Sequence, residues 1–150
     1  MAAYLRGVTL NERAMEITKQ EVKSLLLAES TNASRTFVRN DGVSEFEQVV
    51  IDDQEFDSLR GAWKEATSKL AEKMHEFLTG AVLSDAMAQY VFARTEPIGV
   101  TENARMYVVN YMMADWLASV RPDFRAKYVE RANFEMDDLL RKLYKKESPV

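Results

Sequence analysis

Apolar residues occupy every face of the stretch formed by residues 101–120. From Met106 to Val120 its strongly polar residues are only Asn110, Asp115 and Ser119. A helix that is apolar all round is usually buried. Thr101 can cap its start, and Pro122 ends it because proline cannot continue a helix. We therefore expect a buried central helix over residues 101–120, with the other helices packed around it.

Amphipathic patterns before this stretch predict three further helices. Residues 9–12, TLNE, have the form of a capping box, so a first helix is expected from Thr9 to about Ala28. Asp52 or Asp53 can cap a second helix. Its apolar residues alternate at spacings of three and four: Phe56, Leu59, Trp63, Ala66, Leu70, Met74 and Phe77. A third helix is expected from Thr79 or Ser84 to the TEPIG segment at 95–99.

A last helix is expected after Pro122, with apolar residues at helical spacing on one face. It ends in a basic cluster formed by Arg141, Lys142, Lys145 and Lys146. Positive charge suits the negative end of a helix dipole, so the first interpretation of this cluster is a helix terminus. Contact with nucleic acid is the second interpretation.

Residues 30–53 form an insert of different character. Residues 30–34, STNAS, have the composition of a loop, and Asn40-Asp41-Gly42 is a turn sequence. The flanking arms, residues 35–39 and 43–51, carry β-branched and aromatic side chains, which predicts a loop or a β-hairpin-like arm. An isolated two-stranded hairpin is marginally stable. The arm is therefore expected to pack on its own domain or to lie against another molecule.

Composition favours one helical domain over residues 1–150, all-α, with a short tail at 145–150. Hydrophobic residues make up 47% of the chain and charged residues 29%, with five Gly, three Pro and no Cys. Disulfides and thiolate metal ligands are thus excluded. No window approaches 18 apolar residues and residues 1–15 lack a signal-peptide pattern, so we expect neither membrane insertion nor secretion.

Charge is unevenly distributed. Residues 29–57 carry a net charge of −6 in a chain whose total is −4. Binding to a phosphate backbone needs clustered Lys and Arg, so an acidic chain favours at most non-specific proximity to DNA.

No catalytic motif is present. His75 is the only histidine, and the five glycines are isolated, which excludes imidazole relays, a P-loop and a dinucleotide fingerprint. Acidic residues cluster at 52–57 and 135–138 without the order of a calcium loop. We therefore expect no enzyme, no cofactor and no metal.

Two polar residues on the apolar stretch need an explanation. Asn110 and Asp115 are expected to be buried there, and a buried carboxylate needs a partner. Its candidate partners are Arg94, Arg105 and Arg121. A pair of this kind would fix the packing register, and the alternative is a catalytic or binding acid.

The last third of the chain resembles a known family. The run YVVNYMMADWL at 107–117, the turn at Pro122 and the amphipathic helix ending LRKLY at 140–144 are similar to the small helical head–tail connector, or adaptor, proteins of tailed-bacteriophage necks. The resemblance covers about residues 80–146. It implies a virion structural protein, assembled in the host cytoplasm, with no active site.

The resemblance also implies partners. Such subunits form a ring, commonly of twelve copies, that docks to the portal and joins the capsid to the tail or other neck proteins. The insertion between helices reaches a neighbouring subunit or the tail, and the carboxy-terminal segment reaches the portal. The corresponding interface residues in this chain are Phe37, Phe46, Val49, Ile51, Leu143, Tyr144 and Pro149.

Two other hypotheses stay open. The chain is alternatively a soluble helical protein-binding module or regulator that uses its Phe56–Phe77 face for a partner helix or a dimer. A small helical enzyme with Asp115 as an acid is the third.

Overall fold

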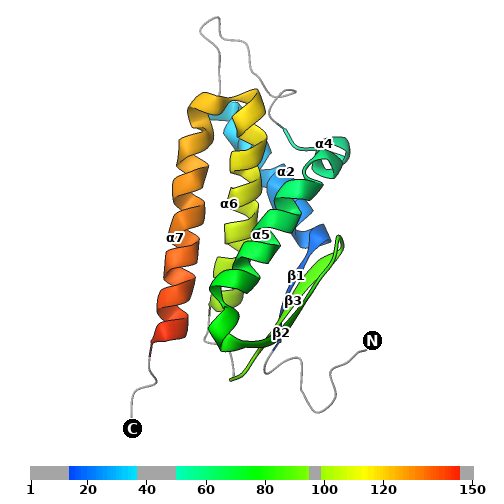
Figure 1. Cartoon of the computed structure of the whole chain (residues 1–150). Helices are drawn as coiled ribbons and strands as arrows, with labels where there is room; N and C mark the ends of the chain where they lie inside the picture. Colours follow the sequence, from blue (N-terminus) through cyan, green and yellow to red (C-terminus); the bar gives the residue numbers. More distant parts are fainter. Residues whose placement is uncertain (1–13, 37–49, 95–98, 146–150) are drawn as a thin grey trace, which may run out of the picture.

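The computed structural model describes residues 14–36, 50–94 and 99–145. These residues form five α-helices and a three-stranded antiparallel sheet, so the chain is mostly helical but not purely all-α. The helices lie to one side of the sheet, with α6 between α7 and the sheet (Figure 1). The elements in chain order are β1 (Ala14–Thr18), α2 (Lys19–Thr36), α4 (Asp53–Ser58), α5 (Arg60–Lys73), β2 (Leu78–Leu83), β3 (Met87–Phe92), α6 (Val100–Val120) and α7 (Arg125–Tyr144).

The sheet has the strand order β1-β3-β2, so β1 and β2 form its two edges. β1 pairs with β3 from Ala14 opposite Val91 to Thr18 opposite Met87. β2 pairs with the other side of β3, with an irregularity between Leu78 and Gly80. The hydrophobic cluster of the core draws on one face of this sheet and on all five helices.

The predicted first helix is wrong at its start, because residues 14–18 form β1. Met15 and Ile17 alternate into the core, at 1% and 0% exposure, which is the period of a strand. The working capping box is one that we did not predict: the Thr18 amide donates to Glu21 Oε1 at 2.8 Å, and the Glu21 amide donates to Thr18 Oγ1 at 3.2 Å. Residues 9–12 lie outside the described residues.

The insert begins later than predicted, since residues 30–34 continue α2. The Ser30 hydroxyl donates to the Leu27 carbonyl at 3.2 Å, and the Ser34 hydroxyl donates to the Thr31 carbonyl at 2.7 Å. The buried Ser30 Oγ also accepts from the Ile51 amide at 2.8 Å, which holds the two ends of the insert together. Tertiary packing therefore overrides a loop-like composition.

The second helix starts as predicted. Asp52 is the N-cap of α4, and its carboxylate accepts from the amides of Gln54 and Glu55 at 3.0 and 3.1 Å. The helix is interrupted at Leu59, continues as α5 and ends at Lys73, before Phe77. A 3₁₀ turn over His75–Phe77 leads into β2.

The predicted third helix is wrong, because residues 78–92 form the hairpin of β2 and β3. Ser84 closes its turn by accepting from the amides of Ala86 and Met87, at 3.2 and 3.1 Å. Two buried aromatic side chains fasten the hairpin to α5. Trp63 Nε1 donates to the Ser84 carbonyl at 2.8 Å, and the Tyr90 hydroxyl donates to the Thr67 carbonyl at 2.7 Å.

Helices α6 and α7 form an antiparallel hairpin joined at Pro122, where the predicted turn and the start of the last helix are confirmed. Thr101 is not the cap of α6. The N-cap is Gly99, whose φ of 92° favours glycine and whose missing Cβ leaves room for Lys142 Nζ.

A polar cluster ties the start of α6 to the end of α7. The buried Asn103 donates to Glu135 at 2.8 Å and to Asp138 at 3.1 Å, and it accepts from Lys142 Nζ at 2.7 Å. The hydrogen bond from Asn103, and then that from Lys142, lower the pKa of Asp138 below its usual range. Part of the predicted basic cluster is thereby engaged within the chain, and Lys146 lies outside the described residues.

Candidate interaction surface

The outer edge of β2, residues 78–83, is the most exposed apolar element of the described chain. Its sequence is LTGAVL, without a charge or a proline. Every residue after Leu78 is exposed, and Val82 and Leu83 expose 54% and 40% of their surface. Edge strands in natural proteins usually carry such protections as charges, prolines or a covering element. We call this strand side the open edge.

Hydrogen bonding shows which backbone groups the open edge presents. The Ser84 amide donates to the Met87 carbonyl at 2.9 Å, so Ser84 faces β3. Antiparallel strands alternate with a period of two, so Val82 and Gly80 also bond to β3. The amide and carbonyl groups of Ala81 and Leu83 therefore point away from the sheet.

The outer edge of β1, residues 14–18, is different, and we call it the guarded edge. By the same alternation, Lys19 bonds to Ala86 and the groups of Glu16 and Thr18 point outward. Glu16 brings an exposed charge to this edge. The outward amide of Thr18 is already taken by Glu21. The two edges of one sheet thus differ in charge, and they differ in whether an outward backbone amide is already hydrogen-bonded.

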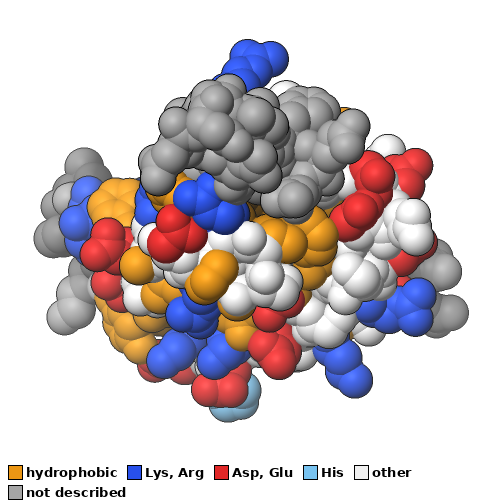
Figure 2. Space-filling model, turned by 90° about the horizontal axis from the view of Figure 1, so that it is seen from above, with side chains coloured by type: hydrophobic (Ala, Val, Ile, Leu, Met, Phe, Trp, Pro, Cys, Tyr) orange, Lys and Arg blue, Asp and Glu red, His pale blue; other side chains and the backbone are white. Residues whose placement is uncertain are grey.

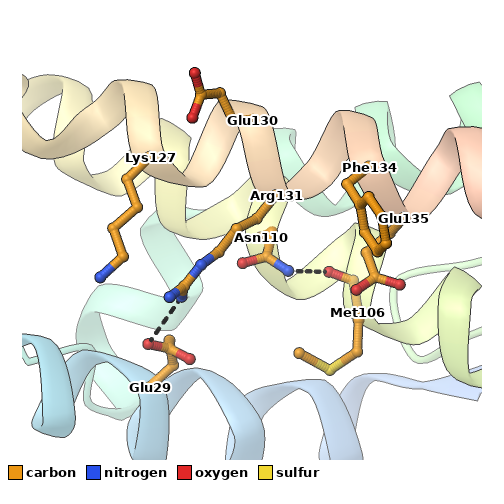
Figure 3. A pocket seen from close by; sticks show the side chains of 8 residues that line it. All are labelled: Glu29, Met106, Asn110, Lys127, Glu130, Arg131, Phe134 and Glu135. Atoms are coloured by element: carbon orange, nitrogen blue, oxygen red, sulfur yellow. Dashed lines mark hydrogen bonds and ion pairs between the residues drawn. The ribbon is translucent and has the colours of Figure 1, made fainter.

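A groove of about 460 Å³ lies between α2 and α7, with α6 at its floor (Figure 3). Arg131 points across it toward Glu29 at 3.6 Å, and the Tyr128 hydroxyl donates to Glu29 at 3.0 Å. Burial, followed by the charge of Glu29, raises the pKa of Tyr128. Asn110 is 3% exposed and donates to the Met106 carbonyl at 2.8 Å. The lining carries three acidic and two basic side chains, so the charges of the groove largely neutralise one another.

A second groove, of about 310 Å³, separates α5 from α7. Tyr111 donates to Glu65 at 2.6 Å within it, and Asp115 stands at its rim. The expectation of a buried, arginine-paired Asp115 is wrong, because Asp115 is exposed. Arg105 instead pairs with Glu21 and Glu102, and Arg121 pairs with Asp123.

The predicted interface residues fall into different environments. Ile51 is 2% exposed and belongs to the core, so it has almost no surface for a partner. Leu143 is half-buried. Tyr144 is 58% exposed, with its ring centroid 4.9 Å from that of Phe77. The remaining predicted contacts lie outside the described residues: Phe37, Phe46, Val49 and Pro149.

The Phe56–Phe77 face, offered above as a partner groove, is used inside the chain. Its central residues have exposures from 0% to 4%: Phe56, Leu59, Trp63, Ala66, Leu70 and Met74. A partner helix would have to displace α6 and the sheet to reach them, since α5 packs against both.

Surface charge on the face seen in Figure 2 is mixed, with Lys and Arg side chains lying among those of Asp and Glu. Within residues 14–36, 50–94 and 99–145, no cluster of three His, Cys, Asp or Glu side chains could hold a metal ion. Over the same ranges, no helix combines the length and the apolar character needed to span a bilayer.

The open edge was missed by sequence reasoning because residues 79–91 also fit a helical period. Signals for a hairpin were present in Thr79-Gly80 and in Ser84-Asp85, which are poor helix residues and good turn residues. Comparison with protein families, with curated proteins and with solved structures gives no match for this chain.

Proposed function

We propose that this protein is a virion structural protein, a subunit of the head–tail connector ring of a tailed bacteriophage. The observation that carries the proposal is the α6–α7 hairpin, since its two long helices and its proline turn form over the part of the chain where the resemblance lies. The resemblance in the carboxy-terminal third supplies the kind of assembly.

The α6–α7 hairpin supports that resemblance over residues 99–145. It combines two helices of 21 and 20 residues with the proline turn on which the similarity rests. Residues 80–92 depart from it, because they belong to the β2–β3 hairpin. The proposal therefore draws on the hairpin and not on the whole matched stretch.

The end of α7 is the part of this chain proposed to contact the portal. Tyr144 is exposed there, and its hydroxyl donates to Glu76, so the aromatic side chain of Tyr144 is held with one face outward. An aromatic side chain presented in a fixed orientation is a common anchor in protein interfaces. Tail or other neck proteins would occupy the opposite side of the ring.

The test uses phage heads that contain the portal but lack neck proteins. Purified protein is added and the particles are imaged by electron microscopy, with the expectation of ring-shaped density at one vertex. Tyr144→Ser should reduce this occupancy severalfold. Phe134→Ser is the matched control, because Phe134 is equally exposed on α7, at 63%, but lies a few turns away.

Bare vertices after incubation with folded wild-type protein would overturn the proposal. Equal occupancy for the two variants would leave the ring standing but would remove Tyr144 from the portal contact.

A further inference from the structure

We infer that the open edge is covered by a second copy of this chain, through antiparallel pairing of the two β2 strands about a two-fold axis at Ala81. The two three-stranded sheets then form one continuous six-stranded sheet. This goes beyond the proposed function, and either can hold without the other.

The occupant must be an extended chain, because the open edge presents backbone groups rather than a pocket. Among protein elements, a strand is the one whose backbone pairs with the outward amide and carbonyl groups of both Ala81 and Leu83. The strand itself carries no charge, so a second copy brings no like charge opposite any of residues 78–83.

The register follows from the alternation of the strand. Residues that face each other across an antiparallel pair lie on the same face of the sheet, and their backbone groups either both point toward the new partner or both point away from it. Centring the two-fold axis on Ala81 meets both conditions, because Ala81 then exchanges two hydrogen bonds with the partner's Ala81. Gly80 faces the partner's Val82, a small residue opposite a large one, on the side of the sheet away from the core.

Leu83 gains most from this pairing. Its 40% exposed side chain lies on the core-facing side of the sheet, where it would stand opposite the partner's Thr79. Burial of apolar surface on this side adds to the six-stranded ladder. In the dimer the two β2 strands lie at the centre of a six-stranded sheet, whereas in one chain β2 lies at the edge of a three-stranded sheet.

The guarded edge is the poorer occupant. A contact between β2 and the β1 strand of another copy would place exposed Glu16 beside an apolar strand. It would also compete for the Thr18 amide, which Glu21 already occupies at 2.8 Å. Pairing of β2 with the β2 strand of a second copy places no charge beside an apolar strand and displaces no hydrogen bond of Thr18.

A two-fold contact closes on itself and recruits no third copy. It therefore cannot build a ring alone, and a ring would need other surfaces of the subunit. The dimer instead protects the open edge in protein that has not yet assembled.

Cysteine cross-linking tests the register directly, because the chain has no native cysteine. In the inferred dimer the two Cα atoms at position 81 lie about 5.5 Å apart, within the range that a disulfide bridges. The two at position 82 lie roughly 8 Å apart, outside that range. Ala81→Cys should form a covalent dimer under mild oxidation, at least tenfold more than Val82→Cys on a non-reducing gel.

Light scattering tests the dimer without a new covalent bond. Wild-type protein should show twice the 17.2 kDa mass of one chain. The measurement is made at about 100 μM, a concentration high enough to populate a weak dimer. Ala81→Pro removes an outward amide but no bond to β3, and Leu83→Lys adds a charge to the edge. Both variants should return to the mass of one chain with an unchanged helical circular dichroism spectrum.

Three results would overturn the inference: a wild-type monomer at this concentration, equal cross-linking at positions 81 and 82, or a Leu83→Lys variant that is folded and still dimeric. The vertex assay above is scored separately. A monomeric variant that still decorates the portal vertex would support the connector proposal while showing that the dimer is not needed for it.

Discussion

The two edges of the sheet show how one fold protects one strand and exposes another. At the guarded edge, Glu16 supplies a charge and the capping box of α2 takes the Thr18 amide. At the open edge, the strand has neither device, although it is fastened from behind by Trp63 and Tyr90. A strand held firmly in place with its outer groups free is a template for another strand. This difference is the basis for the inferred pairing of β2 with a second copy.

Removing the support behind the open edge should have the largest effect. Trp63→Ala deletes a side chain that is 2% exposed, together with its hydrogen bond to the Ser84 carbonyl. We expect a loss of about 3–5 kcal/mol in the free energy of unfolding, the usual range for a buried Trp. Urea denaturation followed by circular dichroism measures it.

Lys64→Ala, at the exposed neighbouring position, is the control and should change stability by under about 0.5 kcal/mol. A Trp63→Ala protein as stable as the control would show that the hairpin does not depend on α5.

A smaller effect is expected from Tyr90→Phe, which removes only the hydrogen bond to the Thr67 carbonyl. The loss should be about 1 kcal/mol at pH 7. Burial raises the pKa of Tyr90 above its ordinary value of 10.0, so the folded phenol stays protonated where the unfolded one ionises. The contribution of Tyr90 to the free energy of unfolding is therefore fully present below pH 10 and falls as pH rises above it.

Denaturation at several pH values between 9 and 11, chosen around the ordinary tyrosine value of about 10, should show a shallower fall for Tyr90→Phe than for wild type. One titrating group contributes at most about 1.4 kcal/mol per pH unit to this slope. Identical slopes for the two proteins would mean that the Tyr90 hydroxyl is not protected from ionisation.

Removing one of the two hydrogen bonds of the capping box beside the guarded edge should cost about as much, while the backbone amide of residue 18 still donates to Glu21. Thr18→Ala deletes the hydroxyl that accepts from the Glu21 amide at 3.2 Å. Loss of an N-cap side chain typically destabilises by about 0.5–2 kcal/mol. Thermal unfolding of this variant is compared with that of Ser24→Ala, an exposed helical position that should change little. Equal stability of the two variants would show that the Thr18 hydroxyl does not stabilise α2.

The smallest effect on stability, and the sharpest on association, is expected from Glu16→Val. Stability should change by under about 0.5 kcal/mol, since Glu16 is exposed. The guarded edge then loses its charge, so species larger than a dimer should appear in light scattering as the β1 edges of different dimers pair. Glu16→Gln tests charge alone, and an unchanged mass for Glu16→Val would show that charge does not guard this edge.

The helices of the carboxy-terminal half were the most predictable elements. Residues 101–120 carry apolar residues on all sides, and the last helix follows a turn that starts at Pro122; both signals are local to the segment. Asp52 likewise carries its capping chemistry within residues 52–55. The exposure of Asp115 was not predictable, because it depends on how far α5 and α7 stand apart at their groove.

The strands were missed for a physical reason. In residues 14–18 and 78–92 the apolar residues fit a period of 3.6 as well as a period of two, and short segments leave the choice open. The outcome depends on partners distant in sequence. β1 finds β3 more than 70 residues later, with Ala14 opposite Val91, and no local signal announces that pairing.

By itself the sequence determined the two long helices of the carboxy-terminal half, the cap at Asp52, and that β2 would carry no charge. These properties belong to neighbouring residues and to composition. Only the tertiary structure decided that Thr18 rather than Thr9 caps the described helix and that residues 78–92 form a hairpin. It also decided that LTGAVL lies at an edge of the described sheet, with the backbone groups of Ala81 and Leu83 pointing away from β3. An edge is defined by which strand is not beside it, and this depends on the packing of the whole sheet.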